Sequence, residues 1–386
     1  MNGRRLSFAA AAGLAAAMGV GRFVFTPLLP IMVDAAEVTP SSGAVIATAN
    51  YAGYLVGAIV LSVRPSINTT TSFRLWTLVL IASELAMAAV HSTATFSALR
   101  FLAGLASAAV FIACASTVTK HRADGASPGI AFGGVGAGIA ASGILTLLAG
   151  PHLSWEALWL CSAILTAVLV APAWTLRVHP EPAGRSEAGE VNAGTRAVWR
   201  TLLVAYFLEG LGYIIVGTFL VAAVGGHGST SVGPVVWIVV GLAAVPATVL
   251  WQGVARRTSL RSALVAAFAL QAVAAVLPAL TGNTVAAVFS ALLFGGTFMG
   301  ITMLTMSTAQ TLSVGRTAAT LTAVYGVGQV LGPLIVAPAI GDSYSIAFAI
   351  ATGVLVLGTV ASLQVLRLSA RGHPQNPLDA GRNIAT

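Results

Sequence analysis

Four charged side chains interrupt the long apolar stretches of this 386-residue sequence: Arg22, Glu84, Arg100 and Glu209. A charge at the centre of a lipid bilayer costs about 3 kcal/mol on insertion scales, so such residues mark substrate or ion pathways unless they form structural pairs. A carboxyl such as Glu209 can carry a proton, and a guanidinium such as Arg22 can bind an anion. A purely structural ion pair between these two stays open. We expect Glu84 to be structural, as a helix-packing partner or as an acid left neutral.

Neutral polar side chains extend this set within the same apolar stretches: Asn50, Tyr51, Tyr54, Tyr213 and Gln329. A tyrosine offers an aromatic wall and a hydroxyl together. An amide can serve only to join helices, which in membranes contributes about 0.6 kcal/mol on average, and we favour that role for Asn50 and Gln329. Together with Arg22, Arg100 and Glu209, these residues predict a pathway for a small substrate and protons.

The apolar stretches that must position these residues are transmembrane helices. The chain is 57% hydrophobic and 8% charged, whereas soluble domains carry about 25% charge. Runs of about 20 apolar residues can cross a hydrocarbon core of about 30 Å, and in lipid every backbone group must be satisfied within its own segment. We predict an all-α membrane protein with twelve transmembrane helices near residues 7–33, 42–63, 75–91, 96–118, 129–150, 156–176, 199–224, 233–253, 262–280, 284–308, 317–340 and 344–366.

The basic residues fix an orientation. Of the 19 Lys and Arg residues, all except Arg22 and Arg100 lie in every second connection or at the span ends beside it. This alternation follows the positive-inside rule, so both termini and the long central loop are predicted to be cytoplasmic in a bacterial inner membrane. The net charge of +8 therefore reflects topology, because these short dispersed loops offer no contiguous surface for nucleic acid.

An internal repeat divides the chain into two similar halves. Gly19-Val20-Gly21 matches Gly210-Leu211-Gly212, and Gly134-Val135-Gly136 matches Gly326-Val327-Gly328, in the same order and at nearly the same offset. Because each half has an even number of spans, the halves keep one orientation, and a substrate site between them near the membrane midplane is expected. The predicted units are a six-helix half at 1–176, a cytoplasmic linker at 177–198, a second six-helix half at 199–366 and a cytoplasmic tail at 367–386.

Local motifs carry a resemblance to a known family. They are Gly21–Met32, Ala49–Leu55, Leu99–Gly104, Gly212–Ile214 with Thr218–Leu220, and Gly328–Pro333. With them the sequence resembles the major facilitator superfamily, and within it the YbfB/YjiJ-type subfamily. The resemblance implies two pseudo-symmetric six-helix bundles whose helices 1, 4, 7 and 10 line a central cavity, which would receive Arg22, Arg100 and Glu209 and leave Glu84 peripheral.

Two details of the resemblance bear on mechanism. Arg100-x-x-x-Gly104 is similar to the arginine motif of proton-coupled exporters, although Arg100 could instead extend to the outer membrane interface. The loop aspartate that many superfamily members carry after helix 2 is absent, because Gly57 is followed by Ala58-Ile59-Val60-Leu61. The usual cytoplasmic salt bridge is therefore not expected.

These features predict a secondary active transporter of a small organic molecule, proton-coupled and exporting by antiport. An uptake symporter of the same fold stays open, as does a non-transporting membrane sensor or scaffold, for which the linker and tail are short. An enzyme is not expected, since the histidines lack metal-site spacing. An ATP-driven pump is not expected either, since Lys120 is the only lysine and forms no phosphate-binding loop. We expect no cofactor and no metal, a monomer in the lipid bilayer, and no nucleic-acid partner.

Overall fold

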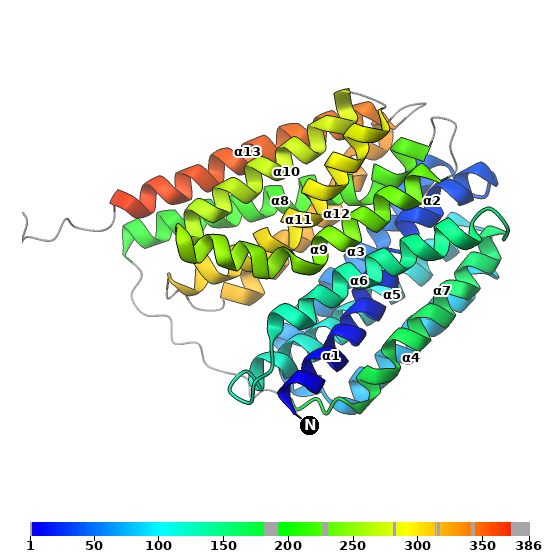
Figure 1. Cartoon of the computed structure of the whole chain (residues 1–386), viewed down its shortest axis with the longest axis horizontal. Coiled ribbons are helices and arrows are strands. Elements are labelled where there is room, and N and C mark those ends of the chain that lie inside the picture. Colours follow the sequence, from blue (N-terminus) through cyan, green and yellow to red (C-terminus); the bar gives the residue numbers. More distant parts are fainter. Residues whose placement is uncertain are drawn as a thin grey trace, which may run out of the picture.

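The computed structural model describes residues 2–180, 192–225, 231–280, 283–312, 314, 317–340 and 344–371. The elements of this described part are helices, shown in Figure 1. The first group is α1 (Gly3–Leu14), the π-helix η1 (Ala15–Val20), α2 (Phe25–Asp34), α3 (Pro40–Val63), η2 (Pro65–Ile67), α4 (Thr70–Met87), α5 (Thr93–Lys120), α6 (Pro128–Ala149), α7 (Trp155–Val170) and η3 (Ala171–Thr175). The second is α8 (Ala193–Gly225), α9 (Val232–Arg257), α10 (Leu260–Leu280), α11 (Thr284–Gln310), α12 (Thr317–Val336), η4 (Ala337–Ala339) and α13 (Ser345–Arg371).

Short polar residues begin many of these helices. Thr39, Thr69, Ser92 and Ser154 each accept a hydrogen bond from the backbone N–H three residues ahead. Such caps satisfy donors that the first helical turn leaves free. Helix α8 begins at Ala193, six residues before the predicted start of the seventh span at residue 199. Its first turns are polar, so they gave no apolar signal.

Part of the predicted connections lies outside the described residues. These parts are 181–191 of the linker and 372–386 of the tail. Basic residues Arg185, Arg316 and Arg382, on which the predicted orientation also depends, fall among the residues that are not described.

Eleven helical segments of the described chain are long and apolar enough to cross a membrane. The first of them, Gly3–Asp34, runs through α1, η1 and α2. The third predicted span corresponds to α4, which is not among the eleven because Arg74 and Glu84 lower its apolarity. The chain is a multi-pass membrane protein.

The first span is broken rather than straight. The backbone N–H of Gly21 bonds the carbonyl of Ala16, five residues back, and a turn covers residues 21–24 before α2 begins. Pro27 has no N–H to offer Phe23, and the N–H of Thr26 takes that carbonyl instead at 3.1 Å. The carbonyl of Arg22, which Thr26 would bond in a regular helix, is thereby left for another donor.

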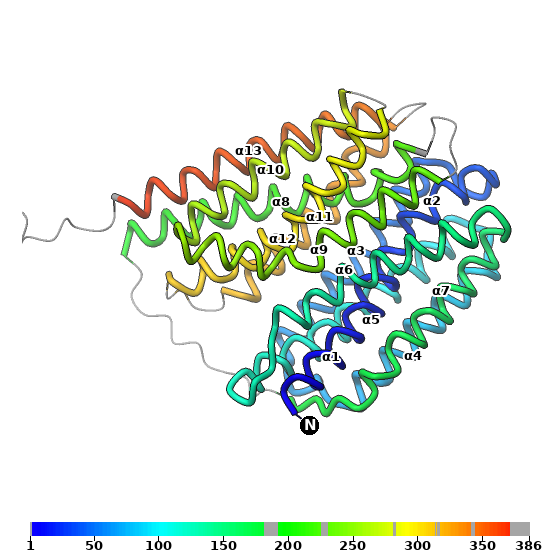
Figure 2. Tube along the Cα trace, viewed as in Figure 1, coloured from blue at the N-terminus to red at the C-terminus, as the bar shows by residue number. Residues whose placement is uncertain are grey.

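The helices gather in two groups, α1–α7 and α8–α13, that lie side by side in Figures 1 and 2. Neighbour pairs in the first group recur in the second: α3 packs on α5 as α9 packs on α11, α4 on α5 as α10 on α11, and α4 on α7 as α10 on α13. The groups meet through α6 with α9 and α3 with α12. Glycines permit the closest approach, since a Cβ on Gly136 would collide with the backbone at Gly241, and one on Gly134 with that of Ala11.

The two groups are joined at one end and separate at the other. Ser41, at the start of α3, donates a 3.1 Å hydrogen bond to the carbonyl of Ala337, at the end of α12. Trp237 of α9 donates to Ser142 of α6 at 3.1 Å, also toward this end. At the opposite end the beginnings of α1 and α8 lie far apart in Figure 1.

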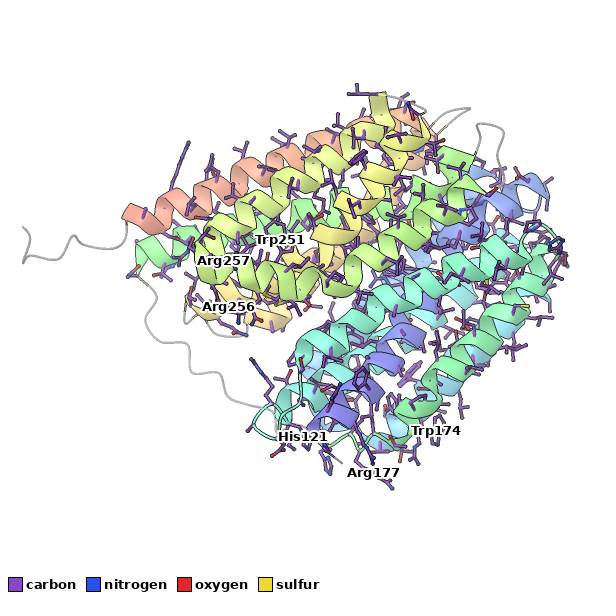
Figure 3. The ribbon with its side chains drawn as sticks, viewed as in Figure 1. His121, Trp174, Arg177, Trp251, Arg256 and Arg257 are labelled. Carbon is purple, nitrogen blue, oxygen red and sulfur yellow. The ribbon has the colours of Figure 1, made fainter. Side chains whose placement is uncertain are left out.

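Basic side chains mark the separated ends. In Figure 3, His121 and Arg177 lie at this end of the first group, and Arg256 and Arg257 at the corresponding end of the second. His121 and Arg177 follow α5 and η3, and Arg256 and Arg257 lie in the last turn of α9. By the positive-inside rule this is the side expected to face the cytoplasm.

Candidate functional site

Arg22 occupies the turn that breaks the first span, and its side chain is 3% exposed. Its guanidinium carbon lies 4.2 Å from the ring centroid of Tyr54, 5.2 Å from that of Tyr51 and 5.3 Å from that of Phe23. Rings at these distances attract a cation, by about 2 kcal/mol or more where water is excluded. The break in the helix thus places a cation inside an aromatic cage.

Gln329 links this cage to the second group of helices. Nη2 of Arg22 donates a 2.8 Å hydrogen bond to Oε1 of Gln329, and Nε2 of Gln329 donates to the hydroxyl of Tyr213. The three residues come from the first span, α12 and α8. Gln329, which we placed among the pathway residues while favouring a role in joining helices, is a direct hydrogen-bond partner of Arg22.

Two further hydrogen bonds join the groups beside this one. Tyr51 and Thr218 share a bond of 2.9 Å between their hydroxyls, and Oγ1 of Thr26 donates to the carbonyl of Gly217 at 2.8 Å. Both run from the first group to α8. The candidate site therefore contains Arg22, Tyr51, Tyr54, Tyr213 and Gln329, and it lies at the contact between the two groups.

Arg100 supports this site from behind. It is 1% exposed, so it does not extend to the interface as one interpretation of the sequence allowed. Its Nη1 donates to the carbonyl of Gly21 at 2.8 Å and its Nη2 to that of Arg22 at 2.6 Å. Asn50 donates in turn to the carbonyl of Arg100 at 2.9 Å. Arg100 thus satisfies the carbonyls that the broken helix frees and holds the backbone that carries Arg22.

Glu209 does not contact Arg22. Its Oε1 accepts a 2.9 Å hydrogen bond from Nε2 of Gln271, on α10, while its Oε2 is buried without a hydrogen-bond partner. The residue is 0% exposed. The buried Arg22–Glu209 pair that the sequence left open is therefore not formed here, because Glu209 points to α10 within the second group. Glu84, also 0% exposed, lies on α4 within electrostatic range of Arg100.

Sequence reasoning missed a column of aromatic rings beside Tyr213. The column consists of Tyr206, Tyr325, Tyr213, Phe294 and Phe298. Neighbouring rings are nearly parallel, with centroids 4.4 Å apart for Tyr206 and Tyr325, 5.4 Å for Tyr325 and Tyr213, and 6.0 Å for Tyr213 and Phe298. Phe294 and Phe298 are four residues apart and so share one helix face, which is a signal the sequence did contain.

The site combines a cation, tyrosine hydroxyls and flat rings. These groups can bind an anionic and partly apolar molecule, and the hydrogen bonds between the helix groups can open or close with it. Within the described residues, no group of three His, Cys, Asp or Glu side chains is placed to hold a metal ion.

Comparison with known proteins identifies the family. The family model described as "Uncharacterised MFS-type transporter YbfB" matches residues 14–363. No curated protein matches the chain. Among solved structures, a mutant of the nucleoside transporter NupG superposes with a TM-score of 0.73 at 13% identity, covering 95% of this chain and all of that one. A second NupG structure superposes with a TM-score of 0.68 at 14% identity over the same shares. At this identity the likeness concerns the fold.

Proposed function

We propose a mechanism from the premise that this chain belongs to the YbfB-type family of transporters in the major facilitator superfamily. The family is one of transporters rather than enzymes. In our proposal the chain is a proton-coupled secondary transporter of a small organic molecule, with export favoured, in which two six-helix halves rock about the candidate site. An uptake symporter would use the same site in the opposite direction.

One observation carries the alternating-access part of this proposal. The hydrogen bond from Arg22 to Gln329 joins the two helix groups through a buried site. This hydrogen bond must break for the two halves to separate at the end where Ser41 and Ala337 now join them. The recurring helix pairs support two pseudo-symmetric halves, and the basic residues at the separated ends support an inward-facing state of a protein in a bacterial inner membrane.

The residues take different roles in this proposal. Arg22, Tyr51, Tyr54, Tyr213 and Gln329 bind the substrate. Arg100 and Asn50 position the turn that carries Arg22. Glu209 carries the proton: among the described residues its carboxyl forms no salt bridge, and its buried Oε2 has no hydrogen-bond partner and is free to receive a proton.

A cross-link across the joined end tests alternating access. A substrate is first identified by comparing metabolite accumulation and susceptibility to toxic compounds between a deletion strain and its parent. In a variant with Cys114 and Cys161 replaced by alanine, Ser41→Cys and Ala337→Cys are then joined by a short bis-methanethiosulfonate reagent. Transport should stop when the reagent is added and return with a reductant.

The matched control joins two residues within one group. Nδ1 of His91 lies 3.2 Å from Oε1 of Glu37 and both side chains are accessible to solvent, so Glu37→Cys with His91→Cys accepts the same reagent. This cross-link should leave transport intact. Full transport by the cross-linked Ser41→Cys and Ala337→Cys protein would show that this end does not open.

A further inference from the structure

Among the residues that the structure describes, Arg22 is a buried cation without an anionic partner. Its one hydrogen bond to a side chain reaches the neutral amide of Gln329, and its Nε is buried without a partner. Within the described part of the chain, no carboxylate lies within salt-bridge distance of it. Buried charges in proteins are paired or serve a function. The missing partner is therefore expected to come from outside the chain.

The present partner of Arg22 is one that an anion can replace. A carboxylate accepts charge-assisted hydrogen bonds that are roughly twice as strong as those to a neutral oxygen, and it can take two from one guanidinium. Gln329 occupies Nη2 alone, while Nε lies free beside it. Release of Gln329 also frees the hydroxyl of Tyr213 from Nε2. An entering carboxylate would thus break the Arg22–Gln329 link between the two groups.

The surroundings select the shape of the rest of the molecule. The guanidinium is flanked by Tyr51 and Tyr54, and Gln329 leads to Tyr213 in the aromatic column. Tyr54 and Tyr325 stay half-buried, whereas Tyr51 and Tyr213 are each 3% exposed. A molecule arriving at the site would meet Tyr54 and Tyr325 first. Flat rings favour an offset-stacked planar group over a bulky saturated one.

From these observations we propose that the site binds a small planar organic anion. Its carboxylate takes the place of the Gln329 amide on Arg22, and its conjugated body packs against Tyr54 and the aromatic column. This substrate class rests on the proposed function, in which the site at the contact between the halves is the transport site.

Three probes of similar size separate charge from planarity. Benzoate is planar and anionic, cyclohexanecarboxylate is anionic but not planar, and benzamide is planar but neutral. Each is titrated against the purified full-length protein, and the midpoint of thermal unfolding is followed, since a ligand of the folded state raises it with concentration. Benzoate should bind about threefold to tenfold more tightly than cyclohexanecarboxylate, as ring stacking predicts, and benzamide at least tenfold more weakly than benzoate.

Two substitutions assign the effects to residues. Arg22→Gln should abolish the benzoate shift, and Arg22→Lys should retain a weaker one because it keeps the charge without the planar fork. The Tyr213→Leu variant should bind benzoate and cyclohexanecarboxylate with equal affinity. If Tyr213→Leu does not fold, the same comparison is made with Tyr325→Leu, at a half-buried position.

Specific outcomes would overturn the proposal. Equal stabilisation by benzamide and benzoate, unchanged benzoate binding by Arg22→Gln, or no shift with either anion would each do so. The cross-linking test uses none of these probes, so the two ideas fail separately. If the cross-link stops transport but benzoate does not bind, only the proposed substrate class is refuted. If benzoate binds but the cross-link does not affect transport, only alternating access is refuted.

Discussion

Replacing Arg100 should destabilise the protein by removing the support of the broken first span. Arg100→Leu leaves the carbonyls of Gly21 and Arg22 buried without their donors. An unsatisfied buried acceptor costs about 1–3 kcal/mol, so two would cost about 2–6 kcal/mol. Relief of guanidinium burial offsets part of this cost, and we expect a net loss of about 2–4 kcal/mol in the free energy of unfolding.

Arg74 provides the matched control. Its Nη2 also donates to a backbone carbonyl, that of Trp174 at 3.1 Å, but at an exposed position. Water can replace this donor, so Arg74→Leu should cost less than about 1 kcal/mol. Unfolding of both variants is followed by titration with sodium dodecyl sulfate in mixed micelles. The reasoning is wrong if the two substitutions cost the same within about 0.5 kcal/mol, the usual precision for independent sites.

Three other predictions can be tested independently. Glu209→Gln keeps the shape and a hydrogen bond to Gln271 but cannot titrate, so it should abolish gradient-driven transport in proteoliposomes while substrate exchange continues; uphill transport with unchanged pH dependence would exclude Glu209 as the proton carrier. Gly134→Val places side-chain atoms against the backbone of Ala11 and should lower the free energy of unfolding by about 2 kcal/mol or more through overpacking. In the control Gly253→Val, the new side chain lies in open space, and the free energy of unfolding should change by less than about 0.5 kcal/mol. Alkaline phosphatase fused after His179 should be inactive and a fusion after Glu37 active; the reverse pattern would invert the topology.

The positions of most helices could be predicted from the sequence, because a run of about 20 apolar residues has few alternatives to a membrane helix. A helix can begin before its apolar run, as α8 does at Ala193. Polar residues in the first turns of a helix do not extend the apolar run from which a span is predicted. A capping residue marks the true start in the sequence only where it is a short polar side chain, as Asn283 is before α11.

The composition of the site could also be predicted, but its partners could not. Successive residues of a helix point about 100° apart, so a small error in the predicted rotation of α8 changes which helix Glu209 is expected to face. In the structure Glu209 faces α10 and not Arg22. The hydrogen bonds of Arg100 go to backbone carbonyls of Gly21 and Arg22, and no residue type marks a carbonyl that a broken helix frees. Pro27, which has no N–H to offer Phe23, is a local sign of that break.

The observed partners also change how proton and substrate could be coupled. A direct contact between Glu209 and Arg22 is absent from the described structure, so the coupling that we propose would have to pass through an intermediate residue. Glu209 and Tyr213 are four residues apart on α8 and therefore share one face of that helix. Glu209 is bonded to α10 through Gln271, and Tyr213 to Arg22 through Gln329. If Glu209 carries the proton, a change in its bond to Gln271 shifts α8 against α10, and the same helix moves Tyr213 relative to Gln329. The proton would thereby bias the link between the halves that an anion on Arg22 also breaks.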